Sequence, residues 1–367
     1  MNILYLTTHL NIGGITSYIL SLASGLKAKG HKVYVASSGG EVLPRFIQEG
    51  IVNIAIPIKT KSEISPKVFI SLFKLLEIIR VKNIDIVHSH TRVTQVLGCL
   101  MHKFSSKPHI WTCHGFFKKR LSRKIFPCWG NKVIAISDSV KEHLLEDFGV
   151  KEEKIRVIYN GIDIEKSQIP NPKSQTEMRK KLGLGEGPVV GIIARLSQEK
   201  GHLYLIQAIR GIIHKFPKVQ LLIVGEGKMQ QRLLDLTKDL GLGGKVFFLP
   251  SAIDTQEIFS VMDIFVLPSL KEGLGLSLME AMARGLAVIG SDVGGIKNLI
   301  QDGENGLLVS PADTKQLSEA ILALLQDSAR REYLGNHARI FIKQNFSLDK
   351  MLQATEKLYL ECLETSC

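Results

Sequence analysis

The chain is poor in the features that mark several common protein classes. It contains five cysteines and two tryptophans among 367 residues. It also lacks the run of about eighteen uninterrupted apolar residues that a membrane-spanning helix requires, so we expect any membrane contact to be peripheral. The cysteines are odd in number, show no paired metal-ligand spacing and favour a reducing cytoplasm; they are Cys99, Cys113, Cys128, Cys362 and Cys367.

Several binding motifs are absent as well. Residues 1–9 carry no basic leader and soon turn polar, so they predict a buried first strand and not a signal peptide. There is no GxGxxG fingerprint, no Walker lysine and no convincing Asp-x-Asp motif near a strand end. The nearest acidic pair, at 163–165, is typical of a boundary turn. Nothing here predicts a dinucleotide or P-loop site, and a metal-free site is favoured.

Acidic residues are scarce in the first half of the chain. Residues 1–165 hold 23 Lys and Arg against 13 Asp and Glu, whereas residues 166–367 hold 24 against 22. Such a positive half suits nucleic acid, anionic lipid or an anionic substrate, and charge alone does not rank these partners. Because no recognised nucleic-acid module accompanies the charge, we expect no nucleic-acid partner.

What the sequence does contain is a repeated alternation of short apolar runs with amphipathic stretches. At 45% hydrophobic and 22% charged residues, the chain is long enough for two domains with separate cores. The alternation predicts an α/β fold with parallel sheets and crossover helices. Strands are expected at 2–6, 31–36, 51–56, 84–89, 109–112, 132–136 and 155–158, then at 189–193, 219–224, 246–249, 264–267, 287–290 and 307–309.

A polar stretch with two prolines, around residues 165–177, separates the two cycles and predicts a hinge. We therefore expect one doubly wound domain at 1–166 and a second at 167–347, with a last helix at about 348–367 packing back on the first. Open α/β sheets bind ligands at the carboxyl ends of their strands, and two such domains would share a cleft there. Functional residues are thus expected in loops that follow strands.

Two glutamates, Glu272 and Glu280, flank a glycine-broken loop and the start of an apolar helix. Glu272 precedes the helix, where a loop carboxylate can reach a ligand, and Glu280 lies about one turn inside it. Gly275 allows close backbone approach, and the helix start at Leu276 leaves amide groups free to bind an anion. The segment offers two hydroxyl acceptors and a phosphate site, as a nucleotide-sugar site requires. The plainer alternative is a helix start with exposed glutamates.

Cations follow the first strand of the second cycle. Arg195 and Lys200 predict a clamp for a diphosphate, the arginine through its planar fork and the lysine as a point charge. A departing diphosphate needs either a metal ion or fixed cations and dipoles. A solvated basic loop is the alternative. In the first half, Gly13 and Gly14 open a helix where backbone can meet phosphate, although a simple tight turn explains them equally well.

Short motifs follow one another along the chain. They are NGID at 160–163, ARLSQEKG at 194–201, VGEG at 224–227, PS at 268–269, KEGLGLSLMEAMA at 271–283, DVGG at 292–295 and DGENGLLV at 302–309. Taken in order, these motifs resemble retaining glycosyltransferase family 4, whose GT-B fold has two Rossmann-like domains facing a central cleft. The likeness spans nearly the whole chain and is specific in the second half and looser in the first. Ala287 stands where the family often has proline, and Ser251 where glycine is common.

The resemblance implies roles for individual positions. Glu272 would contact hydroxyls of the donor sugar and Glu280 would bind the ribose. His114, in a histidine-glycine element after a first-domain strand, would face the donor sugar. The remaining positions implied are Arg195, Lys200, Gly275, Leu276, Gly13 and Gly14 for the diphosphate, and backbone from about Ser251 to Ile253 for the base.

The family transfers sugar with retention, generally without a metal ion or other cofactor. The resemblance therefore implies transfer of a hexose or N-acetylhexosamine from a nucleoside-diphosphate sugar to a glycan or lipid-linked acceptor in bacterial envelope polysaccharide or lipopolysaccharide synthesis. UDP is the expected nucleotide, with GDP and ADP left open. A same-face substitution after domain closure fits best, because no residue is an obvious nucleophile. The rivals are a phosphorylase or nucleotide-sugar epimerase of the same fold, and a non-catalytic sugar-binding protein docked on a membrane.

Two further features leave alternatives open. His88 and His90 end a strand and point the same way, which suggests a ligand contact for His90 or a structural role, since a zinc site would need more ligands. The basic residues at 118–124 predict either a solvated loop or a segment that rests on anionic lipid, at the inner face of the cytoplasmic membrane. Acceptor choice is expected in loops at about 91–100 and 116–125.

Overall fold

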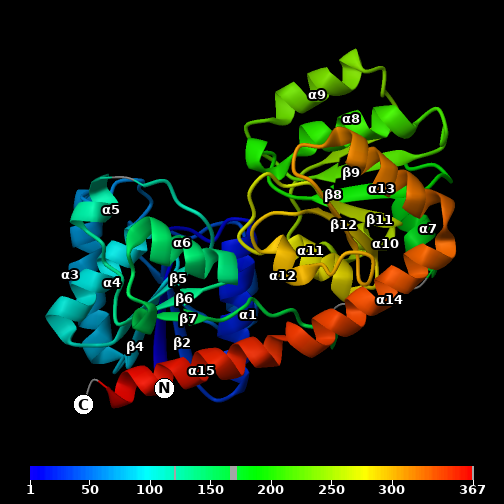
Figure 1. The fold of residues 1–367 in the computed structure, drawn as a ribbon. Helices are drawn as coiled ribbons and strands as arrows, with labels where there is room; N and C mark the ends of the chain where they lie inside the picture. The colour runs from blue at the N-terminus through cyan, green and yellow to red at the C-terminus, as the bar shows by residue number, and fades with distance from the viewer. Residues whose placement is uncertain (120, 166–171, 366–367) are drawn as a thin grey trace. The chain divides into compact units, whose positions relative to one another are not determined.

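The computed structural model describes residues 1–119, 121–165 and 172–365, and its chain forms two compact units, each built round one parallel sheet (Figure 1). Unit 1 comprises Met1–Gly161 and Leu348–Cys367, and unit 2 comprises Ile162–Ser347. The expected boundary between residues 166 and 167 lies outside the described residues, as do residues 166–171 of the expected hinge, whereas residues 172–177 belong to a helix, α7 (Pro172–Lys181). Two doubly wound α/β units of Rossmann type confirm the predicted fold class.

The sheet of unit 1 has seven strands in the order β3-β2-β1-β4-β5-β6-β7, every pair parallel. The strand order changes direction between β1 and β4: β2 and β3 lie on one side of β1, and β4 and its successors lie on the other. Strands β1 and β4 are hydrogen-bonded neighbours, with Ile3 opposite Ile86. In open α/β sheets, ligands bind beyond the carboxyl ends of the strands at such a reversal. The strands are β1 (Asn2–Leu6), β2 (Lys32–Ser37), β3 (Val52–Ala55), β4 (Ile86–Ser89), β5 (His109–Cys113), β6 (Lys132–Ala135) and β7 (Ile155–Val157).

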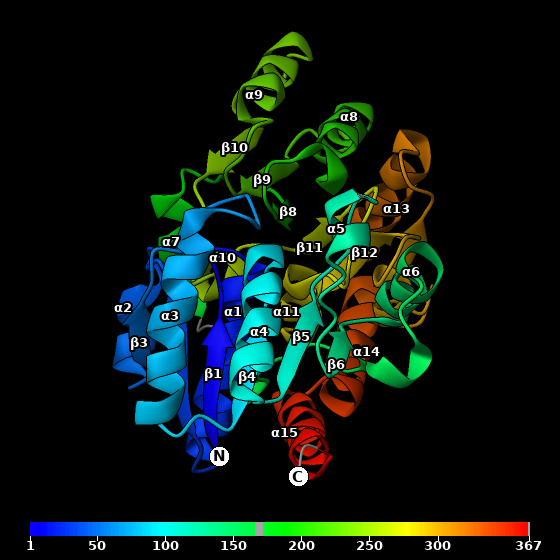
Figure 2. The ribbon, with the colours of Figure 1, turned by 90° about the vertical axis from the view of Figure 1, so that its left-hand side faces the viewer.

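Helices cover the two faces of this sheet in separate apolar layers. Side chains alternate along a strand, so Ile3 and Tyr5 of β1 enter one core while Leu4 and Leu6 enter the other. The first core is completed by α1 (Gly14–Ala28), α2 (Leu43–Gln48) and α15 (Leu348–Glu364). The second is completed by α3 (Pro66–Val81) and α4 (Arg92–Ser105), which Figure 2 shows side by side. Two shorter helices, α5 (Leu121–Ile125) and α6 (Asp138–Phe148), follow β5 and β6.

The chain returns to unit 1 through its last helix, α15, which lies against α1 (Figure 1). At Gly25 of α1 the helices approach so closely that a Cβ would stand 2.4 Å from Cδ1 of Leu352. Tyr359 of α15 is buried within the unit and donates from its hydroxyl to that of Tyr5, 3.3 Å away. Residues from the far end of the chain therefore complete the first core.

Unit 2 repeats the architecture with six parallel strands in the order β10-β9-β8-β11-β12-β13. Here the reversal falls between β8 and β11. The strands are β8 (Val189–Ile193), β9 (Gln220–Val224), β10 (Val246–Leu249), β11 (Ile264–Leu267), β12 (Ala287–Ser291) and β13 (Leu307–Val309). The helices are α7 (Pro172–Lys181), α8 (His202–Ile212), α9 (Gln230–Asp239), α10 (Gln256–Ser260), α11 (Leu276–Ala283), α12 (Ile296–Leu299), α13 (Thr314–Gln326) and α14 (Ser328–Asn345).

Two segments expected to be loops are helical in whole or in part, and the end of the one expected at 116–125 is α5. Residues 91–100 were expected to form a loop, but α4 occupies residues 92–105. The helix is fixed at its start by a capping box between Thr91 and Thr94. Its apolar side chains Val93, Leu97 and Met101 recur at helical spacing and pack into the second core of unit 1.

Candidate functional site

In unit 2, the loop that follows β8 carries both expected cations. Arg195 is exposed two residues beyond the strand, and Lys200 ends a short 3-10 turn, Gln198–Lys200, before α8. The loop after β9 fastens this segment, because Leu196 N donates to Glu226 O at 2.9 Å and Met229 N donates to Leu196 O at 3.1 Å. The backbone that presents the cations is thus held on both sides.

Lys200 meets Glu272 directly across the reversal between β8 and β11. Lys200 Nζ stands 2.5 Å from Glu272 Oε2, and Ser269 Oγ donates to the same oxygen at 3.2 Å. Glu272 is only 9% exposed. Among the described residues no hydrogen bond reaches Glu272 Oε1, so one carboxylate oxygen remains for a ligand hydroxyl. The sequence predicted both residues at the site but not the contact between them.

The start of α11 follows Glu272 within the same segment. Gly275, at the N-cap, has φ of +98°, a left-handed conformation that favours glycine, and no side chain caps the helix. Residues 273–275 also press on the next loop, since a Cβ on Gly295 would stand 2.2 Å from Gly273 O. The first amides of α11, beginning at Leu276, point out of an uncapped helix start, which suits an anion.

Glu280 lies further along α11 and is half-buried. Burial raises the pKa of its carboxyl above the ordinary value, against the opposing charge of Arg284 and a 3.2 Å hydrogen bond from Thr255 Oγ1 to Oε2. Thr255 belongs to the loop after β10 that contains Ser251 and Ile253, the residues expected at the base. This hydrogen bond therefore joins the expected base-binding loop to the helix that carries Glu280.

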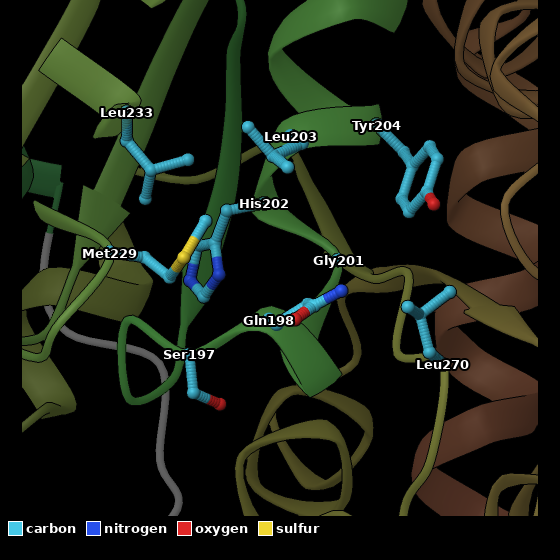
Figure 3. A pocket seen from close by; sticks show the side chains of 9 residues that line it. All are labelled: Ser197, Gln198, Gly201, His202, Leu203, Tyr204, Met229, Leu233 and Leu270. Carbon is cyan, nitrogen blue, oxygen red and sulfur yellow. The ribbon is translucent and has the colours of Figure 1, made fainter. Parts of the chain in front are cut away.

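A pocket lies beside the loop that bears Lys200, and Figure 3 shows the side chains that line it. His202 enters it from the start of α8 and is 2% exposed. Burial, with the nearby charge of Lys200, lowers the pKa of His202 to about 4. Sequence reasoning missed this residue, although it directly follows the Lys200-Gly201 pair. The lining residues are Ser197, Gln198, Gly201, His202, Leu203, Tyr204, Met229, Leu233 and Leu270.

In unit 1, His114 follows β5 and is half-buried. Its Nε2 lies 3.2 Å from Nδ1 of His90, the residue that follows β4. The ring of Tyr18 packs edge-on at 4.9 Å, and burial lowers the pKa of His114 to about 3. Tyr18 lies about one turn into α1, whose exposed start holds Gly13 and Gly14. The structure therefore brings the two expected elements of unit 1 to one edge of its sheet.

The two histidines at the end of β4 have different surroundings. His88 is buried between Tyr359, whose hydroxyl is 2.6 Å from Nδ1, and Thr112, whose hydroxyl is 2.7 Å from Nε2. These contacts assign His88 a structural position. His90 is also buried but faces His114. Within the described residues, no three His, Cys, Asp and Glu side chains stand close enough together to hold a metal ion.

In the basic segment expected at 118–124, Lys118 and Lys119 are exposed but Arg123 is buried. Arg123 is 7% exposed, and its guanidinium lies 4.2 Å from the ring centroid of Phe117. Lys119 pairs with Asp147 at 2.8 Å. Arg120 lies outside the described residues, as do the side chains of Leu121 and Lys124. The expectation of a lipid-facing cation is therefore wrong for Arg123, which is buried with its guanidinium over the rings of Phe117 and Phe148.

Comparison with known proteins covers both units. Residues 12–166 match the model described as glycosyltransferase family 4, and residues 174–341 match the model described as glycosyl transferases group 1. The chain is 30% identical to the UDP-Gal:alpha-D-GlcNAc-diphosphoundecaprenol alpha-1,3-galactosyltransferase of Escherichia coli, over 80% of this chain and 79% of the other. It is 29% identical to the capsular polysaccharide biosynthesis glycosyltransferase CapM of Staphylococcus aureus, over 93% of each.

Solved structures resemble the whole chain. A glycosyltransferase of Rickettsia africae matches with a TM-score of 0.86 at 25% identity, covering 99% of this chain and 98% of the other. HepE of Anabaena, solved with UDP and glucose, matches with a TM-score of 0.87 at 24% identity, covering 98% and 99%. At that identity the second likeness concerns the fold alone.

Proposed function

Since the chain belongs to glycosyltransferase family 4, we propose that it moves a hexose or N-acetylhexosamine from a nucleoside-diphosphate sugar to a hydroxyl of a glycan or lipid-linked acceptor. The proposed donor nucleotide is UDP, and the proposed transfer retains the anomeric configuration without a metal ion. The observation that carries the proposal is the contact of Lys200 with Glu272 at 2.5 Å, on loops after the neighbouring strands β8 and β11.

That contact suits the donor bond that must break. The ammonium group of Lys200 has further donors for an oxygen of the departing diphosphate, and Glu272 Oε1 can accept a hydrogen bond from a sugar hydroxyl. Arg195, on the same loop as Lys200, and the uncapped start of α11 would add positive potential. Each charge-assisted hydrogen bond of this kind contributes about 1.5–3 kcal/mol. Two or three of them would strongly favour departure of the leaving group.

The remaining expected residues take supporting roles in the proposal. Glu280, held by Thr255, accepts hydrogen bonds from the ribose, and backbone between Ser251 and Ile253 binds the base. The lowered pKa of His114 keeps its ring neutral near pH 7, so it acts as a hydrogen-bond partner of the donor sugar and not as a cation. A neutral ring beside His90 neither opposes nor neutralises the charge that develops on the diphosphate.

We propose a same-face substitution as the mechanism. The glycosidic bond to phosphate breaks, the acceptor oxygen bonds to the anomeric carbon on the same face, and the departing phosphate oxygen takes the acceptor proton. We assign Glu272 the role of orienting the sugar, because Lys200 and Ser269 bind its Oε2 and leave Oε1 to accept a hydrogen bond from a sugar hydroxyl.

The acceptor is proposed from chemistry and from the relatives. The Escherichia coli relative is named for transfer to a diphosphoundecaprenol-linked sugar, and CapM for capsular polysaccharide. We propose an acceptor of this class, in bacterial envelope polysaccharide or lipopolysaccharide synthesis, and a place for the enzyme at the cytoplasmic face of the membrane.

The test combines nucleotide binding with transfer. Of UDP, GDP and ADP, UDP should raise the melting temperature most. Glu272→Gln should keep this shift but lose at least about 100-fold in hydrolysis or transfer of the matching nucleotide sugar, whereas Lys200→Ala should weaken UDP binding about ten-fold or more. Glu319→Gln, on the exposed face of α13, is the matched control and should change neither. Failure of every nucleotide to alter the melting temperature would contradict the proposal.

A further inference from the structure

Helix α3 of unit 1 exposes large apolar side chains on the side turned away from its core. Val68, Leu72, Leu75 and Ile79 of this helix pack into the second core of the unit. The outward positions are nevertheless apolar, since Phe69, Ile70 and Phe73 are 47%, 57% and 72% exposed. The water-facing side of a helix normally carries polar residues, so these exposed apolar side chains indicate a binding surface.

More apolar side chains are held beside the start of α3. Ile64, just before the helix, is 72% exposed, and Ile125 and Phe126 are 60% and 49% exposed. Arg92, the first residue of α4, ties these segments together. Its Nε lies 3.1 Å from Glu63 Oε1, and its Nη2 donates to Phe126 O at 2.7 Å. We call the set Ile64, Phe69, Ile70, Phe73, Ile125 and Phe126 the α3 patch.

The surroundings of the α3 patch are positively charged. Residues 57–83 hold six Lys and Arg against two Glu, and one of these two, Glu63, is neutralised by Arg92. Lys59, Lys61 and Lys67 are all exposed. Apolar side chains bordered by exposed lysines match an anionic bilayer, whose headgroups attract the ammonium groups while the interface accepts the apolar ones. They do not suit self-association, because a second copy would bring the same lysines face to face.

The α3 patch lies at the functional edge of unit 1. Helix α3 follows β3 and α4 follows β4, so both helices begin at the carboxyl edge of the parallel sheet. His90 and His114 follow β4 and β5 at that same edge. Across the described residues, no helix has the length and apolar character needed to cross a bilayer.

We propose that the α3 patch rests on the surface of an anionic phospholipid bilayer, with its apolar side chains in the interface and its lysines against the headgroups. The inference deepens the proposed function, on which it rests for its purpose. A lipid-linked acceptor lies in the same bilayer, so binding of the patch brings the acceptor sugar to the edge that holds His114. The contact differs from the one expected at 118–124, where Arg123 is buried.

The experiment measures binding of the full chain to vesicles of phosphatidylcholine alone or mixed with phosphatidylglycerol. The wild type should sediment with the anionic vesicles only, and added salt should weaken binding. The double variant Phe69→Ser/Phe73→Ser should bind at least about ten-fold more weakly. Its control is Tyr333→Ser/Ile340→Ser on α14 of unit 2, two side chains of similar exposure, at 49% and 53%, which should bind as the wild type does.

A second pair of variants tests the charge. Lys59→Gln/Lys61→Gln should lose about five-fold in binding per lysine, whereas Lys215→Gln/Lys218→Gln, exposed in unit 2, should lose little. Unchanged binding of the phenylalanine variant would overturn the proposal, as would equal losses in both lysine pairs. A wild-type dimer that becomes monomeric in the phenylalanine variant would identify the patch as an interface between copies and also overturn it.

The outcome is separable from that of the proposed function. The phenylalanine variant should keep the wild-type melting temperature and its shift with UDP, because it alters only exposed side chains outside unit 2. If the wild type shows no nucleotide shift, the proposed function fails while the vesicle assay still decides the role of the patch.

Discussion

The ion pair of Lys200 and Glu272 depends on a backbone that brings two loops unusually close. At Gly201, immediately after Lys200, φ is +70° and a Cβ would stand only 1.8 Å from Pro268 O, in the loop that leads to Glu272. No side chain fits between these two backbones. The glycine therefore sets the position of Lys200 relative to β11, although it contacts no ligand itself.

Substitution of Gly201 should lower the free energy of unfolding by more than the strain of placing a side chain at a positive φ. Gly201→Ala should destabilise unit 2 by about 3 kcal/mol and abolish the melting shift with UDP, because the added methyl pushes the two loops apart. Gly241→Ala is the matched control, since Gly241 has a similar φ of +65° but no atom within 4 Å of its Cβ position. It should cost about 1 kcal/mol and keep the nucleotide shift. Urea unfolding and thermal shift measure both, and equal losses would contradict the steric argument.

The residues of the candidate site were proposed from the sequence, whereas the contacts between them were not predictable from it. Lys200, Glu272 and Glu280 follow from motif order and residue chemistry. The pairing of Lys200 with Glu272 joins residues 72 positions apart, and His88 meets Tyr359 across 271 positions. The sequence predicted an exposed Arg123 because the residues next to it along the chain are basic, yet its guanidinium lies over the rings of Phe117 and Phe148. Such contacts depend on how elements pack, which local sequence does not encode.

At the scale of elements, the strands were predictable from their apolar runs. The β-rich runs are buried on both faces and are nearly continuous in apolar residues, as in β8 and β9. Helix α4 was missed because its polar first turn resembles a loop. The spacing of Val93, Leu97 and Met101 was the signal that could have identified it.

Helix α15 allows a direct test of how much a remote segment stabilises unit 1. Leu352 is 3% exposed and packs against Gly25 of α1, whereas Leu360 of the same helix is 48% exposed. Leu352→Ala should lower the free energy of unfolding by about 2–5 kcal/mol through the cavity it leaves. Leu360→Ala, with the same change in composition, should stay within about 0.5 kcal/mol of wild type. Urea denaturation distinguishes them, and similar costs would show that α15 contributes little to the core.

At the scale of the whole molecule, unit 1 contains several neutral imidazoles that are buried or half-buried. Burial lowers the pKa of His88 and His90 well below the ordinary value and that of His109 and His114 to about 3. Each of these rings titrates near 6.5 when the chain unfolds. Between those pH values the unfolded chain binds more protons, so the stability contributed by the neutral rings is lost as the pH falls.

These histidines predict that the free energy of unfolding falls as the pH is lowered from 7 to about 5, a range in which ordinary carboxylates remain charged. At pH 6.5 each such histidine should remove about 0.7 kcal/mol of unfolding free energy per pH unit, and the slope should approach about 1.4 kcal/mol per pH unit below about pH 5.5. His109→Gln should reduce that slope by one histidine, since glutamine can still meet Ser89 Oγ, 2.7 Å from His109 Nε2 in the wild type. Urea midpoints at pH 7 and pH 5.5 provide the slopes. Parallel slopes for variant and wild type would contradict the assignment.

The return of α15 to unit 1 bears on how the protein is made. While the ribosome synthesises Ile162–Ser347, the nascent unit 1 has its seven strands but not its last helix, so the face that will receive Leu352 and Tyr359 stays uncovered. At about 5–20 residues per second this interval lasts roughly 10–40 s. Unit 2 is continuous in sequence and can fold first. A chain that ends before α15 would thus have a folded unit 2 joined to an incomplete unit 1 with exposed apolar core residues. Chaperones and proteases recognise such a surface.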